Sequence, residues 1–199
     1  MRLTYLTRYT RTWPVLGLAI FAAASSASAL TCKTFTGTTP QAALAYLQQD
    51  RSTLEPACID QAIGIVKVAH YVPAIAILFT YLDFKKPTDI PGLPPIAHPA
   101  PTSGRYPAAD ALGVFGASII PDLQNMIQNE NAVKITRINA AAIYFFGSPT
   151  ASTVKFIYAA GERAADQDTG GDLRSMAKNM VRYLPKDEQE DCKRSFASQ

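Results

Sequence analysis

Histidine is the scarcest of the residues that could perform chemistry in this chain. Among 199 residues there are two histidines, His70 and His98. A nucleophilic hydrolase needs a Ser or Cys activated by an oriented His, and the chain has no Gly-x-Ser-x-Gly motif. A zinc site needs three or four closely spaced Cys or His ligands, whereas 28 residues separate these two. The sequence therefore predicts no catalytic residue, no cofactor and no enzyme activity. We expect His70 to cap a helix end before Pro73.

One acidic cluster has the spacing of a cation site. Asp166, Asp168 and Asp172 alternate as in a calcium loop, and Gly171 falls at the position of the turn glycine. The same register lacks the third side-chain ligand and the bidentate Glu that closes such a loop. A simpler interpretation is a polar glycine turn followed by Asp172 as the N-cap of a helix over 173–184. We keep calcium binding as an alternative prediction.

The N-terminal residues have the layout of a secretory signal. A basic stretch without acids precedes an uncharged, mostly apolar run over 13–24, which is shorter than the roughly 20 residues that span a bilayer. The small residues 27–29 form a pattern that a signal peptidase accepts. We expect cleavage before Leu30, so that residues 1–29 are the signal peptide and 30–199 form one exported, periplasmic or secreted domain.

Signal cleavage changes the charge of the protein. The whole chain has 19 Lys and Arg residues against 16 Asp and Glu residues. Loss of Arg2, Arg8 and Arg11 with the signal would leave equal numbers of basic and acidic residues. A chain without a basic excess has little to neutralise phosphates with, so we expect no nucleic-acid partner. The mature chain also lacks an apolar stretch long enough to span a membrane.

Proline residues mark where the expected elements begin. Thr39 and Pro40 have the N-cap and first-turn pattern of a helix start, and Pro56, Pro107 and Pro121 are expected to open further helices. Apolar residues then recur at helical spacing, and no segment alternates as a strand does. The sequence therefore predicts an all-α protein.

Internal similarity predicts how these helices are organised. Residues 108–127 align with residues 139–158 at an offset of 31, so that Ala109, Leu112 and Gly116 fall on Ala140, Ile143 and Gly147. A period of about 30 residues built from two short helices is typical of an α-solenoid. In such a fold each helix pair buries its apolar face against its neighbours.

The strings AIGIVKVAHYVPAI (62–75) and ALGVFGASIIPDL (111–123) resemble HEAT-like, that is HEAT/armadillo-type, α-helical repeats. The pattern of that family is a small residue with Leu-Gly on the first helix, a turn glycine, and a Val-Pro-x-Leu/Ile start of the second helix. The resemblance covers about 57–184, with departures at Val68 and at 148–150. It implies a short right-handed α-solenoid of helical hairpins, in an exported bacterial form, that acts as a scaffold for protein contacts.

An elongated fold favours one pairing among the cysteines. The chain has three of them, so at most one internal disulfide can form, and no C-x-x-C redox motif is present. In a solenoid, Cys32 and Cys58 lie closer along the axis than either does to Cys192. We expect the bridge between Cys32 and Cys58, although Cys58 could instead be a small core residue.

A proline-rich loop over 85–107 interrupts the expected repeats. Between Pro87 and Pro107 there are seven prolines in 21 residues, which prevents a helix and favours polyproline II. The loop could pack back on the helices, or it could act as a recognition element or a lid. In the second case its contact residues would be Pro91, Pro94, Pro95, His98 and Tyr106.

Three consecutive aromatic residues suggest a second contact region. Tyr144, Phe145 and Phe146 cannot all face one core from a single helix, so we expect Tyr144 or Phe145 to reach the surface or a groove. An exposed aromatic pair would be a plausible hot spot for a partner. The charged stretch 186–194 is expected to be a short helix that forms a polar cap on the last repeat.

Together these features predict an exported scaffold that binds a protein or peptide partner in the cell envelope and performs no catalysis. Two alternatives stay open. One is an enzyme or accessory protein of the HEAT-like lyase type, which would require a polar pocket containing His70 or His98. The other is a structural module stabilised by calcium at Asp166, Asp168 and Asp172.

Overall fold

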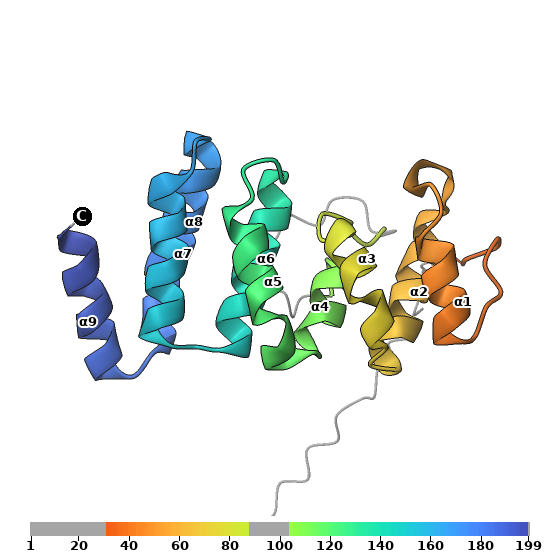
Figure 1. Cartoon of the computed structure of the whole chain (residues 1–199), viewed down its shortest axis with the longest axis horizontal. Coiled ribbons are helices and arrows are strands. Elements are labelled where there is room, and N and C mark those ends of the chain that lie inside the picture. The colour runs from red at the N-terminus through yellow and green to blue at the C-terminus, as the bar shows by residue number, and fades with distance from the viewer. Residues whose placement is uncertain (1–30, 88–103, 199) are drawn as a thin grey trace, which may run out of the picture.

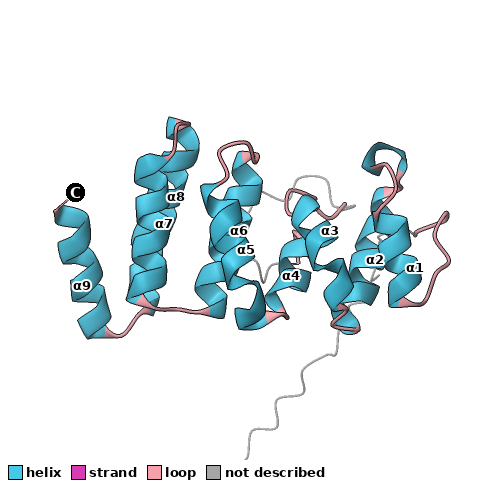
Figure 2. Cartoon of the chain, viewed as in Figure 1, coloured by secondary structure: helices cyan, strands magenta, loops and turns pink. Residues whose placement is uncertain are grey.

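The computed structural model describes residues 31–87 and 104–198, and within these ranges it is built of helices without a strand (Figures 1 and 2). The all-α prediction is therefore confirmed for the part of the chain described. The expected signal peptide 1–29 and most of the proline-rich loop lie outside it. The α-helices are α1 (Pro40–Leu47), α2 (Pro56–Val68), α3 (Ile75–Thr80), α4 (Pro107–Gly113), α5 (Ile120–Gln128), α6 (Lys134–Gly147), α7 (Ala151–Arg163), α8 (Gln167–Met180) and α9 (Lys186–Ala197).

The helices stand side by side along one long axis, with α1 near one end and α9 at the other (Figure 1). Helices α2, α4, α6 and α8 pack successively on one another and form a first layer. In the second layer α5 packs on α7, and α7 packs on α9. Each layer thus contains every other helix of the chain, while α1 packs on α2 at the N-terminal end.

The most extensive helix contacts do not fall where the sequence pattern placed the hairpins. The pattern paired helices across the turns near Gly116 and Gly147. In the structure the most extensive contacts are those between α5 and α6 and between α7 and α8. The turns that connect these pairs lie at the opposite edge of the row of helices (Figure 1). At the first of the predicted turns, Gly116 adopts a φ of +57° and the four-residue 3-10 helix Gly116–Ile119 separates α4 from α5. Gly116 therefore lies at the turn after α4, but this turn does not bring α5 into close contact with α4.

The expected proline positions do begin helices. Pro40, Pro56 and Pro107 each lie in the first turn, and Pro121 is the second residue of α5. A proline costs little there because the first backbone N–H groups of a helix have no intrahelical partner. At α1 the Thr39 hydroxyl accepts a hydrogen bond from the Ala42 N–H at 3.2 Å. These starts were readable from sequence because they depend on local backbone geometry.

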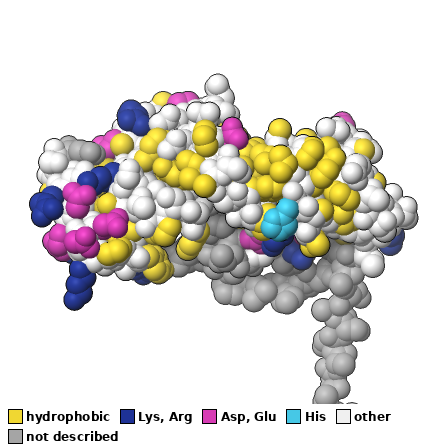
Figure 3. Space-filling model, turned by 60° about the horizontal axis from the view of Figure 1, so that its bottom comes forward, with side chains coloured by type: hydrophobic (Ala, Val, Ile, Leu, Met, Phe, Trp, Pro, Cys, Tyr) yellow, Lys and Arg dark blue, Asp and Glu magenta, His cyan; other side chains and the backbone are white. Residues whose placement is uncertain are grey.

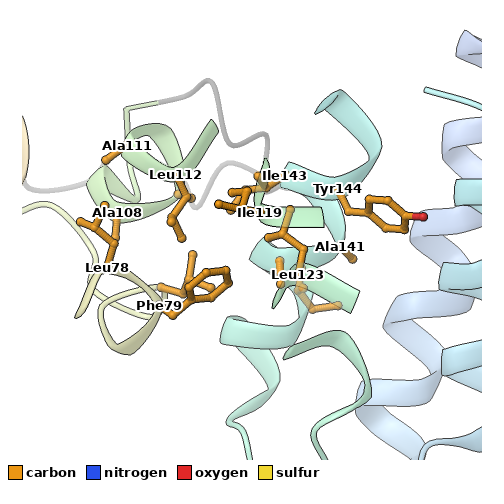
Figure 4. Packing of buried hydrophobic residues seen from close by; sticks show 14 of the residues in the cluster. Leu78, Phe79, Ala108, Ala111, Leu112, Ile119, Leu123, Ala141, Ile143 and Tyr144 are labelled. Atoms are coloured by element: carbon orange, nitrogen blue, oxygen red, sulfur yellow. The ribbon is translucent and has the colours of Figure 1, made fainter. Parts of the chain in front are cut away.

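Small residues set the spacing between helices. The first layer carries fully buried alanines on facing helices, among them Ala108 and Ala109 in α4 and Ala140 and Ala141 in α6. Larger side chains such as Leu78, Phe79, Leu112 and Leu123 fill the space between the layers (Figure 4).

The tightest crossing is made by glycines in α7 and α8. A Cβ at Gly161 would lie 2.8 Å from the Gly170 carbonyl oxygen, and one at Gly170 would lie 2.6 Å from the Gly161 oxygen. Neither position can hold a side chain without moving a helix. Gly170, expected in a turn, is therefore an interior residue of α8, where it permits the close approach.

Side chains from other helices or turns donate hydrogen bonds to carbonyls at, or just past, the C-terminal ends of α1, α3, α5 and α7. Tyr81 Oη donates to Leu47 O at 2.9 Å at the end of α1. Asn139 Nδ2 donates to Leu82 O at 2.6 Å, just past α3, and Arg137 Nε donates to Ile127 O at 2.8 Å in the last turn of α5. At the end of α7, Arg174 donates to Gly161 O at 2.9 Å. The last carbonyls of a helix need such partners when they are buried.

Helix α2 ends in a Schellman motif with a histidine in the left-handed position. His70 has a φ of +47°, its N–H donates to Lys67 O at 3.1 Å, and the Tyr71 N–H donates to Val66 O at 3.1 Å. Glycine is the residue usually found at this position, since a Cβ is strained at positive φ. The side chain of His70 is exposed, so the residue's structural role lies in its backbone.

We predict that His70→Gly stabilises the protein by about 0.5–1 kcal/mol, because it relieves the strain of a β-carbon at positive φ. For a chain of this size the melting temperature should rise by about 2–4 °C per kcal/mol. The matched control is Ala69→Gly, one residue earlier, where φ is −78° and glycine should lower the melting temperature. A melting temperature that falls in both variants would contradict the assignment.

Cys32 and Cys58 form a disulfide, with Cα atoms 4.6 Å apart. The same region is held by Glu55, whose carboxylate accepts a hydrogen bond from the Lys33 N–H at 3.0 Å, and this bond lowers the pKa of Glu55. Cys192 is a free thiol buried between α9 and α7, and burial raises its pKa. The pair that the sequence favoured is thus the pair that the structure joins.

Thiol titration should follow this assignment. The native protein should react slowly or not at all, denatured protein should expose one thiol, and denatured protein treated with reductant should expose three. Reduction should cost about 3 kcal/mol of stability, because the bridge closes a loop over a separation of 26 residues. Three reactive thiols before reduction would contradict the bridge.

Candidate functional site

An apolar groove lies between α3 and α5, two helices that make little direct contact with each other. Its volume is about 700 Å³, within the range of sites that bind ligands or peptide side chains. We call it the α3–α5 groove. Its lining residues are Val72, Pro73, Ile75, Ala76, Phe79, Asp122, Asn125, Met126 and Asn129.

The groove exists because α3 is short. Pro73 lies in a 3-10 helix over Val72–Ala74, and α3 itself runs for six residues before the chain leaves it. The inner residues Leu78 and Phe79 are buried against the first layer, but Val72 remains 64% exposed. A helix as long as α7, with 13 residues, would present more surface to α5.

The two walls of the groove differ in chemistry. The α3 wall consists of apolar side chains, and the whole stretch 68–82 contains no Asp, Glu, Lys or Arg. The α5 wall carries Asp122 and Asn125, three residues apart on one face of the helix, and Asn129, which directly follows the helix. Within residues 31–87 and 104–198, no side chain forms an ion pair or hydrogen bond with the Asp122 carboxylate.

The wider surface also separates apolar from charged regions. Figure 3 shows hydrophobic side chains gathered over the middle and right of one face, with charged side chains crowded at the end where α9 lies. Large apolar side chains exposed on the described surface include Val68, Val72, Val133 and Phe146. Exposed apolar area of this kind marks interaction surfaces more often than isolated surface residues do.

A second pocket, of about 440 Å³, opens between α4 and α6 beside the turns that follow them. Lys67 and Asp110 supply its charges, and Tyr144 and Phe146 are among its walls. Burial raises the pKa of the Asp110 carboxyl, and the nearby Lys67 charge opposes that rise. We call this cavity the α4–α6 pocket.

The aromatic triplet is oriented differently from the prediction. Phe145 is 1% exposed and Tyr144 is 7% exposed, whereas Phe146 is 52% exposed. Tyr144 points away from the α3–α4 core in Figure 4 and packs edge-on against Phe156, with ring centroids 5.6 Å apart. Its hydroxyl accepts a hydrogen bond from Gln124 Nε2 at 2.8 Å. Phe146 is therefore the residue of the three that reaches the surface, whereas Tyr144 lines a pocket, which the groove alternative of the prediction allows.

The reason is that α6 is contacted on three sides. Helices α4, α5 and α8 all pack on it, so its buried face is wider than that of a helix covered on one side. The residue left at the surface is Phe146, one position before the end of α6.

The proline-rich candidates are mostly beyond the described ranges. Pro91, Pro94, Pro95 and His98 lie outside the described residues, so their proposed role in recognition stays a prediction. Tyr106 is described: it is half-buried against the core and immediately precedes α4.

The acidic cluster lies on a helix rather than in a loop. Asp166 is the N-cap of α8 and accepts hydrogen bonds from the N–H groups of Asp168 and Thr169 at 3.2 and 3.1 Å. The Thr169 hydroxyl also donates to Asp166, and this bond is the main cause that lowers the pKa of Asp166. The expected N-cap, Asp172, is instead an interior residue of α8, so that boundary was wrong by six residues.

A lysine lies between the other two carboxylates. Lys134 Nζ is 2.7 Å from Asp168 Oδ2 and 2.7 Å from Asp172 Oδ2. These two hydrogen bonds raise the pKa of the Lys134 ammonium. The carboxylates of Asp168 and Asp172 therefore face Lys134 of α6. Its ammonium group lies between them, where a bound cation would lie.

We predict that calcium leaves the melting temperature of the wild-type protein unchanged, because Lys134 already pairs with both Asp168 and Asp172 and lies between them. Thermal unfolding with added Ca²⁺ or with a chelator measures this directly. A melting temperature that rises with calcium, and loses that response in Asp168→Ala, would support the calcium alternative instead.

The other chemistry-bearing groups are accounted for by structure. Cys32, Glu55 and Cys58 bring three potential metal-ligand atoms within 4.8 Å of one another, but the two sulfurs are bonded to each other. His70 is exposed at the end of α2 and lines neither cavity described above. The α3–α5 groove and the α4–α6 pocket are therefore suited to binding through apolar contacts and hydrogen bonds.

Sequence reasoning did not identify the groove residues. One signal in the sequence could have pointed to them: the stretch 68–82 contains no Asp, Glu, Lys or Arg. In the structure, Val72 and Ala76 within this stretch are exposed. An uncharged segment of that length in a chain with 18% charged residues is either buried or covered by a partner. What the sequence could not show is which side chains stay outside the core.

No family model, curated protein or solved structure matches this chain. In the described ranges, each helix is too short or too polar to cross a membrane.

Proposed function

We propose that the protein is an exported scaffold that binds a protein or peptide partner in the cell envelope, through the α3–α5 groove and without catalysis. The observation that carries the proposal is the groove itself: about 700 Å³, apolar on one wall and continuous with exposed Val72. Burial of exposed apolar surface is the main driving force for protein association.

The architecture supports a scaffold of the α-solenoid type. Helices alternate between two layers along one axis, as in stacked helical repeats, and each contacts mainly its neighbours. Helix α9 carries a charged surface at the C-terminal end, which suits a capping element. A HEAT-like, right-handed superhelix remains a proposal that rests on the repeat pattern of 62–75 and 111–123.

The proposed location rests on two features. Residues 1–29 have the layout of a secretory signal, and Cys32 and Cys58 form a disulfide immediately after it. Disulfides persist in oxidising compartments and are rare in the cytosol. A periplasmic or secreted protein would therefore retain the bridge that anchors the segment before α1.

The enzyme alternative has less support. It required a polar pocket containing a histidine, and the polar groups of the α4–α6 pocket include Lys67 and Asp110 but not His70. That pocket also lacks a serine or cysteine that a base could activate.

The test compares two matched double variants of the tagged full-length protein as baits for envelope extract of the native host. Val72→Asn with Met126→Asn removes one exposed and one half-buried apolar side chain from the groove. Val133→Asn with Ile135→Asn removes an equivalent pair elsewhere. A partner captured by the wild type should be retained by the second variant. The first should lose at least tenfold in affinity, since about 1.4 kcal/mol of lost apolar burial suffices.

Circular dichroism and thermal unfolding check that both variants are folded. Equal retention of the partner by both variants would move the binding site to another surface. Retention of nothing specific by the wild type would count against a scaffold function.

A further inference from the structure

The groove selects its partner by charge as well as by shape. We infer that the occupant of the α3–α5 groove is an amphipathic, cationic segment of a partner protein, which places apolar side chains against α3 and a Lys or Arg against Asp122. This inference rests on the proposed function and names the chemistry of the partner.

The α3 wall sets the apolar half of the requirement. Val72, Ile75 and Phe79 line it, and no donor or acceptor side chain of α3 is among the lining residues. A polar side chain placed against this wall would lose its water without gaining a hydrogen bond, which costs about 1–3 kcal/mol. The partner must therefore present apolar groups on this side.

The α5 wall sets the polar half. Asp122, Asn125 and Asn129 form a stripe along the helix, with Met126 beside it. A carboxylate accepts hydrogen bonds and cannot donate them, whereas an amide can do both. A partner segment that lies along α5 therefore binds best when it presents hydrogen-bond donors to this wall and a cationic side chain to Asp122.

Asp122 is available for such a contact. The side chain is exposed and lies in the first turn of α5. Other exposed carboxylates, such as Asp168 and Asp191, pair with lysines, but no basic residue lines the groove. The groove thus carries one uncompensated negative charge, which attracts cationic partners and repels anionic ones.

The same charge argues against two other occupants. A symmetric dimer through this groove would bring two Asp122 carboxylates into one interface, because a two-fold interface uses the same patch twice, and the lining residues include no basic side chain to pair with them. An anionic lipid surface attracts clusters of Lys and Arg, which the lining residues of the groove lack.

Fluorescence anisotropy with defined peptides tests the inference. The probe is a labelled 14-residue amphipathic peptide with Leu and Phe on one face and Lys on the other. Two matched peptides replace the Lys with Glu, or the Leu and Phe with Ser. The proteins are the wild type, Asp122→Asn, the groove variant Val72→Asn with Met126→Asn, and Asp187→Asn, which neutralises an exposed acid on α9.

We expect the wild type to bind the Lys peptide at least fivefold more tightly than the Glu peptide, and the Ser peptide not at all. Asp122→Asn should reduce the ratio of the two affinities to less than twofold, and Asp187→Asn should leave it unchanged. High salt should reduce the same ratio, because an exposed ion pair is screened.

The possible results separate this inference from the proposed function. Equal binding of the Lys and Glu peptides, lost in the groove variant, would leave the groove as a docking site and overturn the cationic partner. If no apolar peptide binds, both are overturned. A concentration-dependent dimer in light scattering that the groove variant abolishes would assign the groove to a second copy and overturn the inference.

Discussion

The carbonyl groups at the C-terminal ends of α1, α3, α5 and α7 constrain how the rest of this molecule can be arranged. The last four carbonyls of any helix have no intrahelical partner, and burying them unpaired would cost about 1–3 kcal/mol each. In this protein a side chain from another helix or loop binds a carbonyl at each of these ends: Tyr81, Asn139, Arg137 and Arg174. These bonds join consecutive helix pairs at one edge and set their relative height. Arg137 shows the strength of the constraint, because it is 2% exposed and its guanidinium also pairs with Glu130.

The groove follows from where these contacts are made. Asn139 reaches from α6 past α5 to the chain just after α3, so that α3 is held at its end while its outward face stays free. Because α3 is six residues long, the apolar residues before it and in α5 do not cover one another. The same bonding pattern that stabilises the row of helices thus leaves an apolar surface with one acidic group, and this surface carries the proposed binding function.

The acidic cluster and the aromatic triplet show why local patterns misassigned two regions. Asp166, Asp168 and Asp172 have the spacing of a calcium loop, but Gly170 between them lies inside α8. There it allows α8 to approach Gly161 of α7 closely. Tyr144 or Phe145 was expected to reach the surface or a groove, yet α6 is covered by three helices and the exposed aromatic residue is Phe146, near its end. In both cases the deciding contact comes from another helix.

Three features could be read from the amino-acid sequence alone: the helical class, the proline-marked helix starts at Pro40, Pro56 and Pro107, and the charged final helix. Each of these depends on backbone geometry and side-chain periodicity within a few residues, which the sequence displays directly. The prediction that Cys32 and Cys58 form the disulfide also required the expectation of an elongated fold. The folded structure was needed to show that α5 pairs with α6, that Lys134 lies between two carboxylates, and that Val72 and Asp122 share a groove. The physical reason is that burial and carbonyl pairing depend on which helices meet, and that is set by packing across the whole chain.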